Sequence, residues 1–177
     1  MITDLKSGRS RGFPPVVGVA PRVLVLGSLP GRASLEAGQY YAQPRNAFWA
    51  IMGSLCRAGP DLDYRARLDA LTGAGIALWD VLYEATRPGS LDSNIVAASQ
   101  EINDVAGLLT RHESIGLVAF NGQKAAEIFR HRIASSVTRD DVATAILPST
   151  SPAYATLTRA DKLGHWRRIL APYLRAG

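Results

Sequence analysis

The sequence predicts an α/β protein, with a three-layer αβα arrangement around a central, mainly parallel four-stranded sheet. The first observation is that short apolar runs, typical of strands buried on both faces, alternate with longer stretches typical of helices. The second is that each apolar run stops at glycine, proline or a polar residue. Such alternation favours parallel strands whose connecting helices cover both faces of the sheet. With 177 residues, 47% of them hydrophobic, the chain is long enough for one domain with a sizeable core.

We expect strands at residues 23–26, 76–81, 115–120 and 143–147. The expected helices are one that starts at Asn46, residues 64–71 behind an Asp63 cap, residues 100–110, one that ends near His131, and residues 159–174. A Pro/Gly/Ser-rich loop covers residues 86–94. Residues 1–19 are polar and then rich in Pro, Gly and Val, so we expect a loosely ordered N-terminal arm, followed by a single domain over residues 20–177.

Charge and cysteine content narrow the classes of function. The formal net charge of +5 is compatible with a polyanionic partner. The single cysteine, Cys56, excludes an internal disulfide and any four-cysteine zinc or iron–sulfur site. The three histidines fall on different predicted elements, so we expect no metal and no cofactor. No stretch reaches the roughly 18 apolar residues of a membrane span and no signal peptide opens the chain, which predicts a cytoplasmic protein.

The carboxyl ends of the predicted strands mark the expected binding cleft, because ligands of open α/β sheets bind at these ends. They fall at Gly27, Asp80, Asn121 and Pro148, and parallel strands bring them to one edge. The first end is followed by Gly-Ser-Leu-Pro-Gly at residues 27–31. Its glycines and proline predict a tight turn with free backbone N–H groups.

A second unusual segment is Gln-Tyr-Tyr-Ala-Gln-Pro-Arg-Asn-Ala-Phe-Trp at residues 39–49. It gathers two adjacent tyrosines, an amide and the start of a helix within one loop. Aromatic rings can stack on a nucleobase, and a helix N-terminus can hold a phosphate.

These two segments together resemble the uracil-DNA glycosylase superfamily, and in particular its hypoxanthine-DNA (deoxyinosine) glycosylase branch. Leu-Pro-Ser-Thr-Ser-Pro-Ala at residues 147–153 is similar to the DNA-intercalating loop of that family, and the resemblance runs from about residue 23 to residue 170. It implies a monofunctional DNA glycosylase, and we expect the protein to be a monomer. Such an enzyme flips a deaminated base, chiefly hypoxanthine, out of DNA and hydrolyses its N-glycosidic bond, leaving an abasic site.

The resemblance implies that Asn46 is the catalytic residue. Its amide could orient a water and face a cationic sugar without ionising. The alternative is an ordinary helix N-cap. Tyr41 is the expected base-stacking ring, with core packing as the alternative.

Further residues complete the expected site. We expect Ser28, Leu29 and Asn121 to contact the base, although Asn121 could instead cap the next helix. The expected DNA contacts come from the turn, the long segment and the intercalating loop: Gly31, Arg45, Ser149, Thr150, Ser151 and Pro152. For these residues a solvated surface loop is the alternative.

Two positions depart from the wider superfamily. Leu29 stands where many relatives carry an Asp or Asn that activates water, and Leu147 where many carry a His or Asn that stabilises the leaving base. Neither leucine can do this work, so uracil or mismatched-thymine excision is the secondary expectation. Backbone N–H groups of the turn could help the base leave, and Asp80 could position the water. A catalytically inert module that binds damaged DNA is the alternative from another class.

Overall fold

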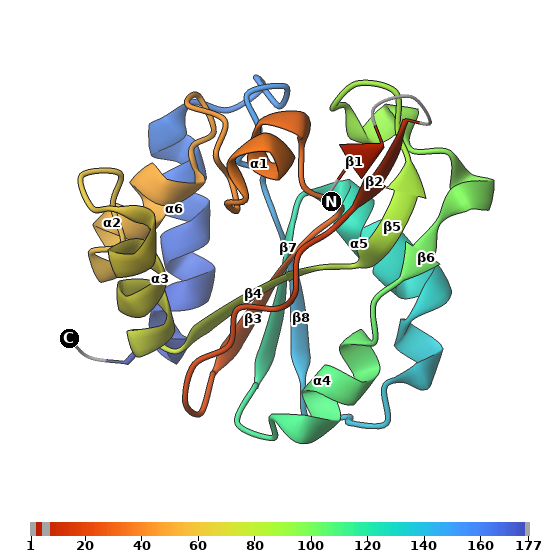
Figure 1. Ribbon diagram of the computed structural model, residues 1–177. Helices are drawn as coiled ribbons and strands as arrows, with labels where there is room; N and C mark the ends of the chain where they lie inside the picture. Colours follow the sequence, from red (N-terminus) through yellow and green to blue (C-terminus); the bar gives the residue numbers. More distant parts are fainter. Residues whose placement is uncertain (1–2, 5–7, 176–177) are drawn as a thin grey trace.

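A four-stranded parallel sheet forms the centre of the computed structural model, which describes residues 3–4 and 8–175 (Figure 1). The strands lie in the order β4-β3-β7-β8, and every neighbouring pair is parallel. Their bounds are Val23–Gly27 for β3, Ile76–Asp80 for β4, Leu117–Asn121 for β7 and Ala143–Leu147 for β8. The predicted fold class is confirmed.

Helices cover both faces of this sheet, which gives the three layers (Figure 1). One face carries α2 (Phe48–Cys56), α3 (Tyr64–Gly73) and α6 (Arg159–Leu170), and the other carries α4 (Val105–Arg111) and α5 (Gln123–Arg132). A hydrophobic core lies between the sheet and the helices on each face. Strand β3 contributes to both cores, because Val23 and Val25 pack with the first group of helices while Leu24 and Leu26 pack with the second. In the described residues, the helical elements also include a short helix α1 (Arg32–Ala37) and four 3-10 helices: η1 (Asp92–Asn94), η2 (Ala97–Ser99), η3 (Ala134–Ser136) and η4 (Ala171–Tyr173).

A second, antiparallel sheet was not predicted from the sequence. Its order is β1-β2-β5-β6, formed by Thr3–Asp4, Arg9–Arg11, Leu82–Thr86 and Glu101–Ile102. The expected loose arm is therefore wrong for residues 9–11, which pair with β5, and for Val16, which bridges to Leu78. Residues 1–2 and 5–7 of that arm lie outside the described residues.

Two predicted helix starts shift because polar side chains bind nearby backbone N–H groups. The Asn46 Oδ1 accepts from the N–H of Phe48 at 3.0 Å, so a turn precedes α2 and the helix begins at Phe48. The helix expected from residue 100 begins at Val105, where Asp104 is the N-cap and accepts from the N–H of Gly107. The other boundaries differ by only a few residues, and the expected Asp63 cap of α3 is present.

The three tryptophans anchor loops to the two cores. Trp49 Nε1 donates to the carbonyl of Tyr40 at 2.9 Å, and Trp166 Nε1 donates to the carbonyl of Pro148 at 2.9 Å. Trp79 Nε1 donates to the carbonyl of Phe13 at 3.1 Å. The indole N–H groups are thereby satisfied, and the loops before α2 and after β8 are fixed to rigid elements.

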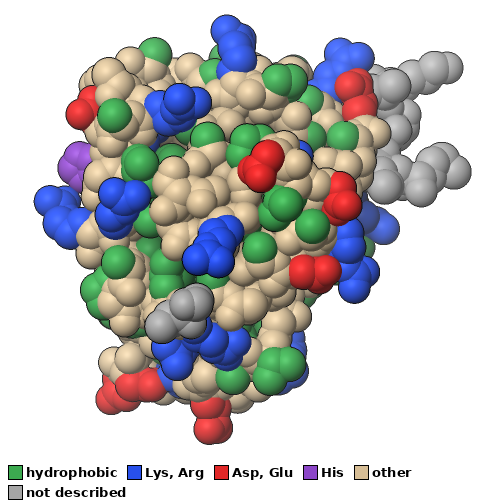
Figure 2. Space-filling model, turned by 90° about the vertical axis from the view of Figure 1, so that its left-hand side faces the viewer, with side chains coloured by type: hydrophobic (Ala, Val, Ile, Leu, Met, Phe, Trp, Pro, Cys, Tyr) green, Lys and Arg blue, Asp and Glu red, His purple; other side chains and the backbone are tan. Residues whose placement is uncertain are grey.

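Positive charge is spread over the α2, α3 and α6 side of the molecule. Figure 2 shows Lys and Arg side chains at several separate places on this face, with acidic side chains both among them and along the edges. Among the described residues, no helix is long and apolar enough to cross a membrane.

Candidate active site

A cavity of about 700 Å³ opens where the carboxyl ends of the parallel strands meet. Gly27 pairs in register with Asp80, and Asn121 with Leu147, so these strand ends do converge. The cavity is of the size that holds a small-molecule ligand or a single nucleotide. All of the residues expected in the site line it: Ser28, Leu29, Gly31, Tyr41, Arg45, Asn46, Asn121, Ser149, Thr150, Ser151 and Pro152. This placement is geometric, and the roles assigned to these residues stay predictions.

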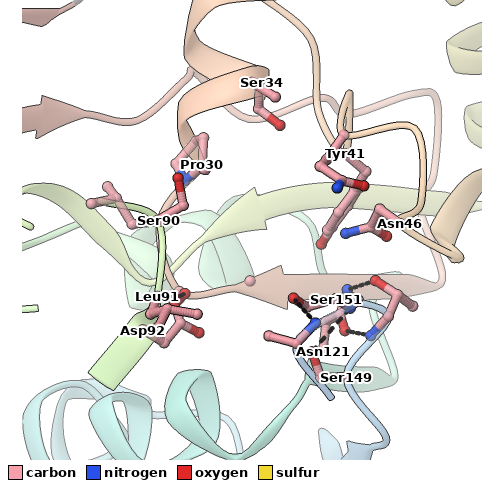
Figure 3. A pocket seen from close by; sticks show the side chains of 18 of the residues that line it. Pro30, Ser34, Tyr41, Asn46, Ser90, Leu91, Asp92, Asn121, Ser149 and Ser151 are labelled. Carbon is pink, nitrogen blue, oxygen red and sulfur yellow. Dashed lines mark hydrogen bonds between the residues drawn. The ribbon is translucent and has the colours of Figure 1, made fainter. Parts of the chain in front are cut away.

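Tyr41 and Asn46 form one wall of the cavity (Figure 3). The Tyr41 ring is half-buried and stacks on Phe48, with ring centroids 3.9 Å apart and planes 22° apart. Its neighbour Tyr40 is a core residue instead, because it is buried and its carbonyl accepts from Trp49. Tyr40 also contributes to the cavity lining but is only 3% exposed, so Tyr41 is the tyrosine whose ring a bound ligand could meet.

Asn46 has features of both roles considered from the sequence, a catalytic amide and a helix N-cap. Its Oδ1 accepts from the N–H of Phe48, but the N-cap of α2 is Ala47, which makes no side-chain cap bond. Figure 3 shows the amide nitrogen of Asn46 directed toward the space beside Tyr41. The bonded oxygen fixes the amide, so the –NH₂ group can be presented to a ligand.

Asn121 and Thr150 join β7 to the loop that follows β8. Asn121 Nδ2 donates to Thr150 Oγ1 at 2.9 Å, and Asn121 Oδ1 accepts from the N–H of Thr150 at 2.9 Å (Figure 3). The carbonyl of Thr150 accepts from the N–H of Ala47 at 3.0 Å, which ties this loop to the start of α2. The expected capping alternative for Asn121 is wrong, because the N-cap of α5 is Gly122 and has no side-chain bond.

The opposite wall contains residues that were not selected from the sequence. Asp92 accepts from Ser28 Oγ at 2.7 Å and lies 3.7 Å from Arg87 Nη1. The buried Arg87 also donates to the carbonyls of Leu29, at 3.1 Å, and Pro30. A signal was present in the sequence, because an arginine directly before Pro-Gly-Ser opens the loop at a strand's carboxyl end. These bonds clamp residues 27–31 against residues 87–92.

Asp80, the last residue of β4, is a buried acid in the cavity lining. Asp80 is 4% exposed, and its Oδ2 has no hydrogen-bond partner among the described residues. Burial raises the pKa of Asp80 to about 7, with a further contribution from the negative charge of Asp92 and opposition from Arg87.

Lys162, on α6, binds the backbone of the expected intercalating loop and of the residue that follows it. Its Nζ donates to the carbonyls of Tyr154, at 2.7 Å, and Ser151, at 3.3 Å. The same ammonium lies 5.2 Å from the centre of the Tyr154 ring, and burial lowers the pKa of the lysine. Within residues 3–4 and 8–175, no group of three or more His, Cys, Asp or Glu side chains is placed to hold a metal ion.

The three-layer fold, with its cavity at the carboxyl edge of the sheet, is that of a known superfamily. The model of the family described as "Uracil DNA glycosylase superfamily" matches residues 14–175, and the chain belongs to this superfamily.

Within it, the chain is similar to proteins named hypoxanthine DNA glycosylase. It is 41% identical over 122 residues to the one from Methanosarcina barkeri, covering 67% of this chain and 75% of that protein. It is 41% identical over 118 residues to the one from Methanosarcina acetivorans, covering 66% of this chain and 73% of that protein.

A solved structure shares the fold. It is a solution NMR structure from Methanosarcina acetivorans, described as that of a candidate uracil DNA glycosylase. The TM-score is 0.77 at 32% identity, and the match covers 93% of this chain and 98% of that one.

Proposed function

We propose that the protein is a monofunctional DNA glycosylase that removes deaminated bases, chiefly hypoxanthine, and leaves an abasic site. It flips the damaged nucleotide out of the DNA and hydrolyses the bond between sugar and base. The proposal includes action as a monomer, without metal or cofactor, in the cytoplasm. Membership of the uracil DNA glycosylase superfamily and the names of two 41% identical relatives support it.

The single observation that carries the proposal is the wall formed by Tyr41 and Asn46 beside the strand-end cavity. Extraction of a base from the duplex costs a few kcal/mol, and stacking on an aromatic ring offsets about 1–3 kcal/mol of this. When the glycosidic bond breaks, positive charge develops on the sugar. A fixed amide beside the sugar can orient the attacking water and stabilise that charge.

The loops around the cavity are assigned to DNA binding in this proposal. The exposed Arg45 and the partly exposed Ser149 and Ser151 line the cavity and suit phosphate oxygens. Thr150 is 1% exposed and its hydroxyl accepts from Asn121, so only its backbone position serves the loop. The half-exposed Tyr154 and the adjoining Pro152 supply an apolar wedge that can fill the gap left by a flipped base. Ser28 and Asn121 would then act on the base, although both of their side chains also hold loops together.

A lesion panel tests the proposal directly. Duplexes that carry hypoxanthine, uracil, xanthine or mismatched thymine at one position are incubated with the protein and scored for abasic sites. We expect hypoxanthine to be released fastest, and uracil slowly, because the 5% exposed Leu29 offers no water-activating group. Tight binding of these duplexes without formation of abasic sites would mean an inert damage-binding module and would refute the glycosylase assignment.

A further inference from the structure

A departing base carries negative charge, and position 147, where many relatives of the superfamily carry a His or Asn that stabilises it, is a leucine here. The water-activating position 29 is also a leucine. Leu147 is 2% exposed, packs in the core beneath α2 and α6, and is not part of the cavity lining. Leu29 lines the cavity but has no polar atom in its side chain. A different group must therefore face the base.

Asp80 lines the cavity at the carboxyl end of β4, beside the end of β3. Gly27 is its register partner, and a Cβ added to Gly27 would lie 2.5 Å from Asp80 Oδ1 and 3.4 Å from the Tyr41 hydroxyl. The carboxyl group therefore occupies the space directly over the backbone of Gly27, beside the end of the Tyr41 ring. Only glycine leaves room for it there.

The surroundings of Asp80 favour its neutral form. Arg87, at the end of β5, is directed to Asp92 and to the carbonyl of Leu29, and the ion pairs found among the described residues do not include Asp80. Burial, and then the charge of Asp92 on η1, raise the pKa of Asp80 to about 7, while Arg87 opposes this shift. Tyr40 and Tyr41 face it from the loop before α2, and burial raises the pKa of both phenols, so neither is an anion at neutral pH.

We propose that Asp80, as a neutral carboxylic acid, donates a hydrogen bond from its O–H to the O6–N7 edge of the departing hypoxanthine. This inference rests on the proposed function and adds the group that stabilises the leaving base. When the C1′–N9 bond breaks, its electron pair goes to the base and the negative charge spreads to O6 and N7. The water oxygen bonds to C1′ and its proton ends on the base, so Asp80 keeps its own proton. Ionised Asp80 would repel the departing base instead.

The proposal predicts a descending limb in the pH profile at alkaline pH. The measurement is the single-turnover rate of hypoxanthine release between pH 5.5 and pH 9 for the wild type, Asp80→Asn and Asp69→Asn. Asp69, on the surface of α3, is the matched control for the Asp-to-Asn change. We expect the wild type and Asp69→Asn to lose rate about ten-fold per pH unit above pH 7. Asp80→Asn also donates from a neutral group, so it should stay within about ten-fold of the wild type at pH 6 and change less than about three-fold up to pH 9.

A second variant keeps Asp80 in place. Asp92→Asn removes the negative charge that disfavours ionisation of Asp80, so the descending limb should move to lower pH. Circular dichroism checks that each variant folds.

Three results separate the possible failures. If the wild type releases no base from any duplex, the proposed function itself is wrong. If it is active but shows no alkaline loss, or if the loss persists unchanged in Asp80→Asn, only the role of Asp80 is overturned. If the descending limb of the Asp92→Asn variant stays at the same pH as in the wild type, the alkaline loss of rate comes from the ionisation of a group other than Asp80. Ionisation of the substrate base would appear equally in all variants, so it cannot imitate the expected difference.

Discussion

Tyr41 has a backbone conformation that side chains with a Cβ rarely adopt. Its φ is +55°, in the left-handed region, and its ring is held against Phe48 at 3.9 Å. Such strain persists only where surrounding contacts fix the residue, and here it turns the ring into the cavity wall. A preformed ring needs no ordering when a base arrives, which lowers the entropic cost of binding.

Two replacements of Tyr41 should distinguish the contribution of its ring to DNA binding from that of its hydroxyl group. Tyr41→Phe keeps the ring, so we expect it to bind a duplex containing hypoxanthine within about three-fold of the wild type. Tyr41→Ala removes the stacking surface and should weaken binding by about 1–3 kcal/mol. The comparison uses dissociation constants in an Asn46→Ala background, which prevents turnover. Equal losses in both variants would point to a hydrogen bond of the hydroxyl in place of stacking.

Asp80 should also make the stability of the fold depend on pH. Its folded pKa of about 7 lies above the usual value of about 3.9, so the native state binds more protons than the unfolded chain between those values. The free energy of unfolding should therefore fall as pH rises from about 4 to about 7, by up to about 1.4 kcal/mol per unit from this group. Urea unfolding at pH 5 and pH 7 measures it. Asp80→Asn should flatten the slope and Asp69→Asn should not; identical slopes in all three proteins would contradict the burial argument.

At the scale of elements, loop 149–154 is fixed from three sides. Asn121 at the end of β7 holds Thr150, the carbonyl of Thr150 accepts from Ala47 at the start of α2, and Lys162 on α6 holds the carbonyls of Ser151 and Tyr154. A loop that is rigid before DNA arrives can insert its apolar tip without a further ordering cost.

Lys162→Met should loosen this loop while leaving the cavity wall intact. We expect affinity for a duplex with an abasic-site analogue to fall about ten-fold, whereas the single-turnover rate at saturating protein stays within about three-fold. Lys124→Met, on α5 away from the cavity, is the control for loss of one positive charge. If Lys162→Met lowers the saturated rate and leaves affinity unchanged, the lysine acts on the chemistry and not on the loop.

The parallel sheet and its helices could be predicted mainly because β3, β4 and β7 are continuous apolar runs up to their last residue, while β8 is shorter and contains Thr144. Strands β3 and β4 are buried at every position, which such runs report directly. Strands β2, β5 and β6 could not be found this way, since they are short, mostly polar or half-exposed, and pair with partners far away in the sequence. The same holds for Arg87 and Asp92, whose importance comes from contacts with residues about 60 positions earlier.

At the scale of the whole molecule, the parallel topology places the site. It brings Gly27, Asp80, Asn121 and Pro148 to one edge, so the amide, the acid and the loops proposed to contact DNA come from distant parts of the chain. The second sheet adds to this, because β5 leads directly into Arg87 and the wall that carries Asp92. Strand ends were predictable from hydrophobic patterns, whereas hydrogen bonds between loops depend on three-dimensional contacts.

The reaction should need no divalent metal, because Asn46, Asp80 and the loop N–H groups supply the proposed chemistry. We expect hypoxanthine release to be unchanged, within about two-fold, after treatment with a chelator. Activity that disappears with chelator and returns with added metal would overturn this prediction. A chelator-sensitive metalloenzyme, assayed in the same buffer, confirms that the treatment works.

The central claim is that Asn46 acts on the substrate and does not merely shape the start of α2. The most direct test measures single-turnover hypoxanthine release and thermal unfolding for Asn46→Ala, Asn46→Ser and Asn46→Asp. Serine and aspartate can still accept from the N–H of Phe48, so both should regain most of the roughly 0.5–2 kcal/mol that alanine loses. Serine is too short to reach the sugar or the water, so Asn46→Ser should remain about 100- to 1,000-fold slow, as Asn46→Ala does, with Asn46→Asp intermediate. Recovery of both stability and rate in Asn46→Ser would make Asn46 a purely structural residue and contradict the proposed mechanism.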